Sequence, residues 1–440
     1  MASRKAKLGL VAVAATTALL LTSCSSGGGE AAADNTIDGE ISGDIKVLTW
    51  RTDLVQDGTY DRYVEEFEKK YPDVNVTIEA VTDYATEMQT RMSTTNYGDV
   101  LGIPTIQPAQ YEQFLEPLGD TADFEDTYRF LPAASFDGTQ YGIAWGGNAN
   151  GVVYNKKVLE AAGVTELPTS EDEWLDALQK VKDNTDAVPL YTNYKGGWPL
   201  AQSFGNLGGI TNDPDAPITL AEDPAPWTEG TDQYAIDSLL YESVAAGLTE
   251  DDPLTTDWEQ SKVLIGTGEV AAMTLGSWAV SQMKAAAEDN GASADDIGFM
   301  AFPANVDGQQ YAVIGGDYNL GVSKHSKAKA AAWAFIQWIV GESDYTQVQG
   351  MVSTLKDDPL PESLTDFEAN GVELLEINPA PAGKEGLLNE VANDSQIDLY
   401  GPIYRQKLVD IARGAADGDK ESYFAELNER WGASVEKLAG

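Results

Sequence analysis

The stretch from Ile45 to Ala80 decides the fold, and it reads IKVLTWRTDLVQDGTYDRYVEEFEKKYPDVNVTIEA. Side chains alternate from Ile45 to Trp50, which predicts a strand. Apolar side chains then recur at helical spacing from Tyr60 to Tyr71, and Pro72 ends the predicted helix. Alternation returns from Val74 to Ala80. A strand, a helix and a second strand in this order form a βαβ unit, so we expect a parallel sheet with a right-handed crossover.

A similar pattern recurs later in the chain. Gly151 to Tyr154 is predicted as a strand, and Lys156 to Ala162 as a helix closed by a glycine. Ser170 and Glu173 stand at capping-box spacing before the next predicted helix. Ala330 to Val340 is apolar on most sides, so we expect this helix to be enclosed in a core. The folded part starts near Ile41 and runs for about 400 residues, too long for one compact core, so the length predicts two lobes.

The N-terminus carries an export signal. A basic start is followed by an apolar run from Leu8 to Leu21, roughly the length of a signal-peptide core and too short to span a membrane. The run ends in Leu21-Thr22-Ser23-Cys24, which resembles the lipobox of bacterial lipoproteins, where the cysteine is acylated and becomes the new N-terminus. We expect a signal peptide over 1–23, lipidation (palmitate) at Cys24 and a flexible linker over 24–43. The alternative is a plain secretory signal with an incidental cysteine.

Charge and composition exclude several classes of function. The formal net charge is −43, and it becomes −46 when the three basic residues of the signal are removed. Such a surface repels phosphate backbones and anionic headgroups, so we expect no nucleic-acid partner and no membrane contact except through the lipid anchor. Cys24 is the only cysteine and His325 the only histidine. We therefore expect no disulfide, no metal site, no cofactor and no catalytic triad.

Six segments, taken in order, resemble the extracellular solute-binding proteins of bacterial ABC importers, in the carbohydrate group that includes maltose-binding protein. They are the opening strand into Trp50 followed by the Tyr60 helix, Tyr97-Gly98-Asp99-Val100, Phe114 to Leu118, Gly151 to Gly163, the stretch Gly266 to Trp278 with its Gly-Ser-Trp ending, and Gly315 to Val340. The segments 211–230 and 356–361 match no motif of that family, and either could line a ligand cleft.

The resemblance implies an α/β fold of the periplasmic-binding-protein type, with two lobes, each a mostly parallel sheet flanked by helices, joined by a hinge. The implied N-terminal lobe is 44–149 with 311–345, and the C-terminal lobe is 150–310 with 346–440. The implied activity is binding without chemistry: a monomer, lipid-anchored on the extracellular face of a Gram-positive cell membrane, that closes around a carbohydrate and then docks on ABC permease subunits. Hinge strands are expected near Ala149-Asn150 and Val313-Ile314.

Sugars combine hydroxyl groups with apolar C–H faces, so their sites need aromatic platforms beside amides and carboxylates. Such ligands bind beyond the carboxyl ends of strands. Trp174, Trp333 and Trp338 stand on apolar helix stripes and are expected in the core. The resemblance implies a different set at the cleft: Trp50, Arg51, Asp99, Trp145, Asn148, Trp198, Trp278 and Asp317. Alternative roles are a turn cap for Asp99 and an ion pair with Asp53 for Arg51.

Two rival functions are compatible with the sequence. A binding protein for polyamines or another small solute would also use aromatic rings and carboxylates, and the acidic composition suits it. A secreted glycoside hydrolase would need two carboxylates on rigid strand ends, which 71 acidic residues do not forbid. A thermal-shift screen separates the ligands, and product formation separates a hydrolase from a binding protein.

Overall fold

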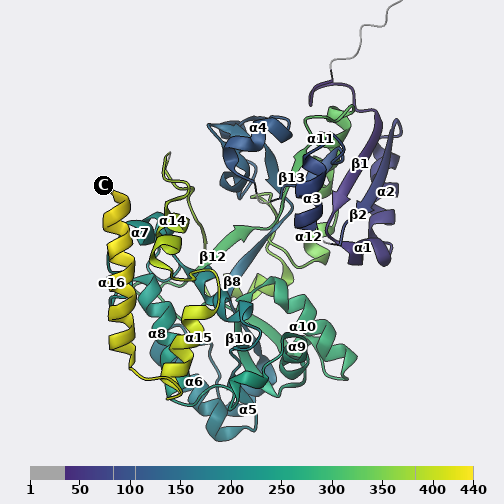
Figure 1. The fold of residues 1–440 in the computed structure, drawn as a ribbon. Helices are drawn as coiled ribbons and strands as arrows, with labels where there is room; N and C mark the ends of the chain where they lie inside the picture. Colours follow the sequence, from purple (N-terminus) through teal and green to yellow (C-terminus); the bar gives the residue numbers. More distant parts are fainter. Residues whose placement is uncertain (1–34, 83, 105, 382, 440) are drawn as a thin grey trace, which may run out of the picture.

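The computed structural model describes residues 35–82, 84–104, 106–381 and 383–439. Two lobes, each built on its own β-sheet, are joined by strands that pass between them (Figure 1). The predicted two-lobe α/β class is confirmed. The predicted signal peptide, Cys24 and most of the linker lie outside the described residues. Within the described residues, no helix is long and apolar enough to cross a membrane.

The N-terminal lobe contains a five-stranded sheet in the order β2-β1-β3-β13-β7. Its strands are β1 (Gly43–Thr49), β2 (Val74–Ala80), β3 (Val100–Gly102), β7 (Gly142–Ala144) and β13 (Asn319–Val322). The predicted βαβ unit is confirmed, since β1 pairs in parallel with β2, and α1 (Thr52–Gln56) and α2 (Thr59–Lys70) lie between them. β13 pairs antiparallel with β3 and β7 because the chain re-enters this sheet from the other lobe. The sheet is therefore mixed rather than mostly parallel.

Helices cover both faces of this sheet. Val47 points toward α2 and α11 (Lys329–Gly341), and the core between them includes the buried Trp333 and Trp338. Leu48 points the other way, toward α3 (Tyr84–Met92). The other elements of the lobe are α4 (Tyr111–Phe114), α12 (Tyr345–Val348), η1 (Pro108–Gln110), η2 (Thr121–Asp123), η3 (Leu131–Ala134), β4 (Gly119–Asp120), β5 (Ser135–Phe136) and β6 (Thr139–Gln140).

The C-terminal lobe has a second mixed sheet in the order β14-β12-β8-β10-β9, with β11 also paired to β8. Its strands are β8 (Gly147–Asn155), β9 (Val188–Leu190), β10 (Val270–Gly276), β11 (Ile297–Met300), β12 (Tyr311–Gly316) and β14 (Glu373–Glu376). Here too the prediction of a mostly parallel sheet is corrected, because β8 pairs antiparallel with β10, β11 and β12. β8 and β12 both arrive from the N-terminal lobe or return to it, which sets their opposed directions.

Helices surround the second sheet. The helices are α5 (Lys156–Ala162), α6 (Glu171–Asn184), α7 (Ala216–Glu222), α8 (Asp232–Ala245), α9 (Trp258–Thr267), α10 (Trp278–Asp289), α13 (Thr365–Ala369), α14 (Leu387–Ser395), α15 (Ile403–Ala412) and α16 (Lys420–Ala439), with η4 (Trp198–Asn206), η5 (Pro253–Thr255), η6 (Ala294–Asp296) and η7 (Glu362–Leu364). The N-cap of α6 is as predicted, since Ser170 Oγ accepts from the Glu173 amide. The Glu173 carboxylate accepts a hydrogen bond from the Thr169 amide, whereas in a capping box it would accept from the amide of Ser170. The unplaced segment 211–230 contains α7, which packs with α14 and α16.

The two lobes meet at the predicted hinge strands. β8 and β12 pair where Ile314 faces Ala149, and both strands run between the lobes in Figure 1. The chain crosses a third time near Val352, which bridges to Gly147. The segment before this third crossing still contacts the N-terminal lobe, because Tyr345 and Gln349 accept hydrogen bonds from Arg51. Gln349, which follows the expected boundary at residue 345, is therefore in contact with the N-terminal lobe.

Candidate functional site

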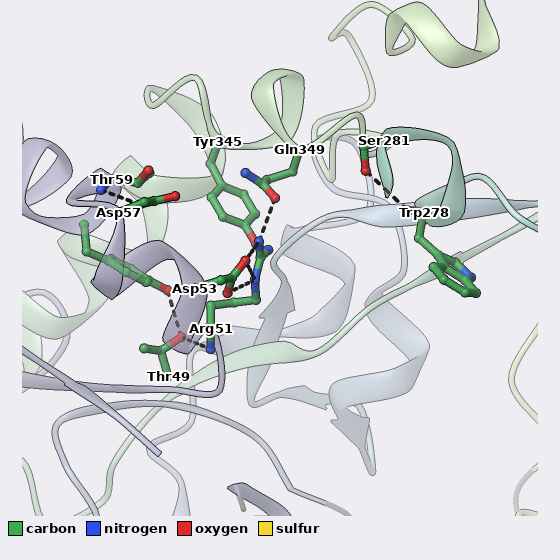
Figure 2. Close-up of polar contacts among 10 residues, drawn as sticks. Thr49, Arg51, Asp53, Asp57, Thr59, Trp278, Ser281, Tyr345 and Gln349 are labelled. Atoms are coloured by element: carbon green, nitrogen blue, oxygen red, sulfur yellow. Dashed lines mark hydrogen bonds and ion pairs between the residues drawn. The ribbon is translucent and has the colours of Figure 1, made fainter. Parts of the chain in front are cut away.

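A cavity of about 450 Å³ lies between the lobes, beside the paired hinge strands. The N-terminal lobe, the hinge strands and the third crossing contribute one wall, and helix α10 of the C-terminal lobe contributes the other. The lining residues are Arg51, Asp53, Asn148, Asp317, Gln349 and Met351 on the first side and Trp278, Ser281, Gln282 and Ala285 on the second. Figure 2 shows the Arg51 cluster on one side and Trp278 with Ser281 on the other.

Arg51 is held rigidly at the end of β1. Its backbone amide donates to Thr49 Oγ1 at 3.1 Å. Its guanidinium donates to both carboxylate oxygens of Asp53, at 2.9 Å from Nε to Oδ1 and 2.6 Å from Nη2 to Oδ2. Further bonds reach the Tyr345 hydroxyl at 2.9 Å and Gln349 Oε1 at 2.8 Å. The hydrogen bond from Arg51 holds the pKa of Asp53 below its usual value, so the two form a charged pair on the cavity wall.

Asp317 and Asn148 bring polar atoms to the cavity from the hinge strands. The Asp317 amide donates to the Gly146 carbonyl at 2.9 Å, and Asp317 Oδ1 accepts from the Tyr318 amide at 2.8 Å. The surrounding protein desolvates this carboxyl and raises its pKa, despite the nearby charge of Arg51. Asn148 Oδ1 is buried and has no hydrogen-bond partner among the described residues. Asp317 is exposed to the cavity and thus available to a ligand hydroxyl, and Asn148 lines the cavity beside it.

Helix α10 presents one polar face to the cavity. Ser281, Gln282 and Ala285 follow Trp278 by three, four and seven residues, which is the spacing of one helix face. A methyl group at Gly276 would lie 2.6 Å from the Trp278 ring, so this position must be glycine for the ring to lie where it does. The cavity therefore has an aromatic ring at one end of a hydroxyl- and amide-bearing surface.

Two further tryptophans support Trp278. The Trp278 ring lies 5.8 Å from that of Trp198 and 5.7 Å from that of Trp258, and Trp198 and Trp258 are 4.8 Å apart. Trp198 is 42% exposed, which is unusual for so large an apolar side chain. The three rings form a continuous aromatic surface, which we call the tryptophan cluster, on the C-terminal lobe beside the cavity.

Four of the eight expected cleft residues line the cavity: Arg51, Asn148, Trp278 and Asp317. A fifth, Trp198, does not line the cavity but packs against the Trp278 ring, which does. The other three lie elsewhere in this structure. Trp145 is 1% exposed in the core of the N-terminal lobe. Trp50 packs between Tyr318, at 4.1 Å, and Trp145, at 5.0 Å. Asp99 accepts from the Lys46 amide and the Ser326 hydroxyl, so it joins distant segments and does not make the turn cap that was its alternative role.

The sequence reasoning missed several lining residues. Ser281, Gln282 and Ala285 could have been predicted, because they share one helix face with Trp278. Asp53 was considered only as a partner of Arg51. Gln349 and Met351 carried no signal, since their segment was assigned to the other lobe. The segment 356–361 does not line the cavity.

The comparisons with known proteins agree with this architecture. Residues 52–345 match the family described as bacterial extracellular solute-binding protein. The chain belongs to this family. Among the described residues of this solute-binding protein, no group of three His, Cys, Asp or Glu side chains could hold a metal ion.

Similar proteins are binding proteins for sugars. BlMnBP1 of Bifidobacterium animalis subsp. lactis, solved with mannobiose, is 34% identical, with a TM-score of 0.79 over 92% of this chain and 99% of that one. BlMnBP2 of the same organism, described as manno-oligosaccharide specific and solved with mannotriose, is 33% identical, with a TM-score of 0.77 over 90% and 95%. The diacetylchitobiose binding protein DasA of Streptomyces coelicolor is 25% identical over 66% of this chain, and the match spans 65% of its own length.

Proposed function

We propose that this solute-binding protein captures a neutral sugar or oligosaccharide in the cavity between its lobes and delivers it to the permease of an ABC importer. The observation that carries the proposal is the chemistry of the cavity wall. Trp278 offers a flat apolar face, and Asn148, Ser281, Gln282 and Asp317 offer hydrogen-bonding groups around it. Sugars present this same combination of apolar faces and hydroxyls. The ligands of the similar Bifidobacterium proteins make manno-oligosaccharides the first candidates.

The charges in the cavity favour a neutral ligand over an anionic one. Arg51 is paired with Asp53, and its hydrogen bonds to Tyr345 and Gln349 occupy it further. Asp317 has no ion-pair partner among the described residues. The lining therefore carries one positive and two negative side chains, and a uronic acid or a sugar phosphate would meet uncompensated negative charge.

A thermal-shift panel tests the proposal. Mannobiose, mannotriose, raffinose and diacetylchitobiose are compared with galacturonic acid and with spermidine. A neutral sugar should raise the melting midpoint, by an amount that grows with its concentration above Kd. If spermidine alone raises the melting midpoint, the ligand is a polyamine and the sugar proposal is rejected. If a sugar that raises the melting midpoint is also cleaved when it is incubated with the protein, the protein is a hydrolase rather than a binding protein.

We also propose that Cys24 anchors the protein to the outer face of the cell membrane. The support is the sequence Leu21-Thr22-Ser23-Cys24 after a short apolar run, together with membership of an extracellular family. Two acyl chains give stable attachment where one gives only marginal binding. Cys24→Ala should move the protein from the membrane fraction to the medium or leave an unprocessed precursor. Processing and retention like the wild type would contradict the anchor.

A further inference from the structure

Tyr400 is a large aromatic side chain left open to solvent close to the proposed sugar cavity. It is 56% exposed, and its neighbour Ile403 is 69% exposed. Its ring packs perpendicular to that of Phe204, with ring centroids 5.3 Å apart. The turn that carries it is fixed by Asp398, whose carbonyl and carboxylate accept from the Gly401 and Ile403 amides. Tyr400 is thus held in place although it is exposed.

Two separate routes connect Tyr400 to the cavity. The first runs over the tryptophan cluster from Trp278 to Trp198. Gly197, the residue before Trp198, lies against Pro402, where a methyl group would be 3.1 Å from Cγ. Pro402 belongs to the same Asp398 turn as Tyr400. The turn that carries Tyr400 is therefore in contact with the segment that carries Trp198.

The second route follows strand β8. Asn148 lines the cavity, and Asn150 lies on the same face of the strand, about 7 Å further along. A side chain at Gly205 would collide with Asn150, so the strand and η4 are in direct contact there. Phe204 precedes Gly205 and packs on Tyr400. The Tyr400 ring is therefore connected to the hinge strand through Phe204 and the contact between Gly205 and Asn150.

The Tyr400 side chain is exposed but partly desolvated. Although its ring is exposed, neighbouring protein raises the pKa of its hydroxyl by desolvation, as happens for the carboxyl of Asp317 in the cavity. An aromatic ring that is backed by another ring and open on its outer side is suited to the C–H face of a pyranose ring.

We propose that Tyr400, backed by Phe204, forms an outer subsite that stacks on a sugar unit beyond those held in the cavity, so that the ligand is an oligosaccharide of three or more units. This inference rests on the proposed function. A mono- or disaccharide seated against Trp278 would leave Tyr400 uncovered. Tyr400 would then determine preference for chain length and not the ability to bind sugar.

Titration calorimetry with mannobiose, mannotriose and mannotetraose tests the subsite in wild type, Tyr400→Ala and Tyr400→Phe. Leu438→Ala is the control, because Leu438 is exposed on α16 at the outer side of the lobe. The wild-type affinity should rise with chain length. Tyr400→Ala should lose about 5- to 150-fold for the longest chain that reaches the ring and leave mannobiose within about 2-fold, by analogy with base stacking on aromatic rings. Tyr400→Phe and Leu438→Ala should behave like wild type.

Other outcomes separate the subsite from the proposed function. Equal losses for all three sugars, or no loss for any, would overturn the subsite and leave sugar binding intact. A wild-type affinity that does not change from mannobiose to mannotetraose would also overturn the subsite and leave sugar binding intact. If none of these sugars binds the wild type, the outer subsite is rejected for them, and the thermal-shift panel still decides the proposed function independently.

Discussion

Trp278 and Trp145 carry the same side chain in opposite environments, and this difference predicts opposite effects of truncation. Trp278 lines the cavity, and Trp145 is buried against Trp50 and Tyr345. Trp278→Ala should weaken sugar binding by about 1–3 kcal/mol, as for stacking of bases on aromatic rings, and keep a near-native melting midpoint. Trp145→Ala should lower the free energy of unfolding by about 3–5 kcal/mol. Calorimetric affinity and chemical denaturation are measured for both variants.

The result that contradicts the site is a collapsed midpoint for Trp278→Ala with normal affinity in the fraction that remains folded. Trp278 would then be a structural residue of the tryptophan cluster. The search for the stacking platform would move to Trp198, which is the most exposed ring of that cluster.

Asp317 should link ligand binding to stability through its charge. Its pKa is raised in the native state because the carboxyl is desolvated, so the native state holds the proton more tightly than the unfolded state. The stabilising contribution of this group is therefore present below its unfolded pKa, about 3.8, and is lost as pH rises through the native pKa. At pH 7 the ionised carboxylate is retained at a cost in stability.

Asp317→Asn should therefore melt higher than wild type at pH 7 in the absence of ligand, and the difference should shrink as pH falls toward the unfolded pKa. The same variant should bind sugar more weakly, because it lacks the carboxylate that accepts from paired hydroxyls. Melting midpoints over pH 3.5–7 and affinities at pH 7 check both effects. A lower midpoint for Asp317→Asn at pH 7 would show that Asp317 is stabilised by Arg51 instead.

At the residue scale, the sequence indicates which side chains suit sugar binding, but it predicts only in part which of them reach the cavity. Gly276-Ser277-Trp278 and Gly316-Asp317 combine small residues with a functional side chain, and both reach the cavity. Trp50 and Trp145 also follow strands, but other aromatic rings cover them. Which side of a strand end faces solvent depends on packing from distant segments. No local pattern contains that information.

At the scale of elements, α10 joins the cavity wall to the hinge through the residue before its first turn. Ser277 Oγ accepts from the Ala149 amide at 3.0 Å, and the Ser277 amide donates to the Ala149 carbonyl at 2.8 Å. Ala149 is buried on the hinge strand β8. Trp278 is the next residue, so its position is fixed directly against the hinge.

Ser277→Ala should lower the free energy of unfolding by about 1–3 kcal/mol, because it removes the side-chain acceptor of a buried amide. Ser281→Ala is the matched control on the same helix. Ser281 is exposed, and its replacement should change stability by no more than about 0.5 kcal/mol. Urea denaturation measures both. Equal stabilities for the two variants would mean that the backbone ladder alone holds the hinge strand.

Elements with a strong hydrophobic periodicity could be predicted from the sequence. Their arrangement relative to elements of the other lobe could not. The βαβ unit, α5, α6 and α11 occur where the sequence predicts them. Trp278 begins α10, a helix that the sequence analysis does not predict, so the helix face with Ser281 and Gln282 was not found. The direction of β8 and β12 depends on crossings between lobes, which explains why mixed sheets were predicted as mostly parallel.

At the scale of the whole molecule, each lobe has hydrophobic cores of its own. The core around α2 and α11 lies within the N-terminal lobe, and the cores around α5, α6 and the C-terminal helices lie within the other lobe. Three crossings connect them, near Ala149, Ile314 and Val352. We expect bending at these strands to change the cavity and to leave these cores intact, while a further cluster, with Phe130 and Ala144, packs across the crossings.

Ligand should therefore compact the protein without changing its secondary structure. A sugar that touches both Arg51 or Asp317 on one wall and Trp278 on the other gains contacts only when the walls approach, so binding favours the closed arrangement. Small-angle scattering should show a smaller radius of gyration at saturation with the best sugar from the thermal-shift panel, while far-UV circular dichroism stays the same. A sugar that gives no thermal shift is the control and should leave the radius unchanged. If the radius also stays constant at saturation with a bound sugar, closure is not part of capture, and the permease must recognise the ligand-bound protein by the surface of its cavity instead of by the approach of its lobes.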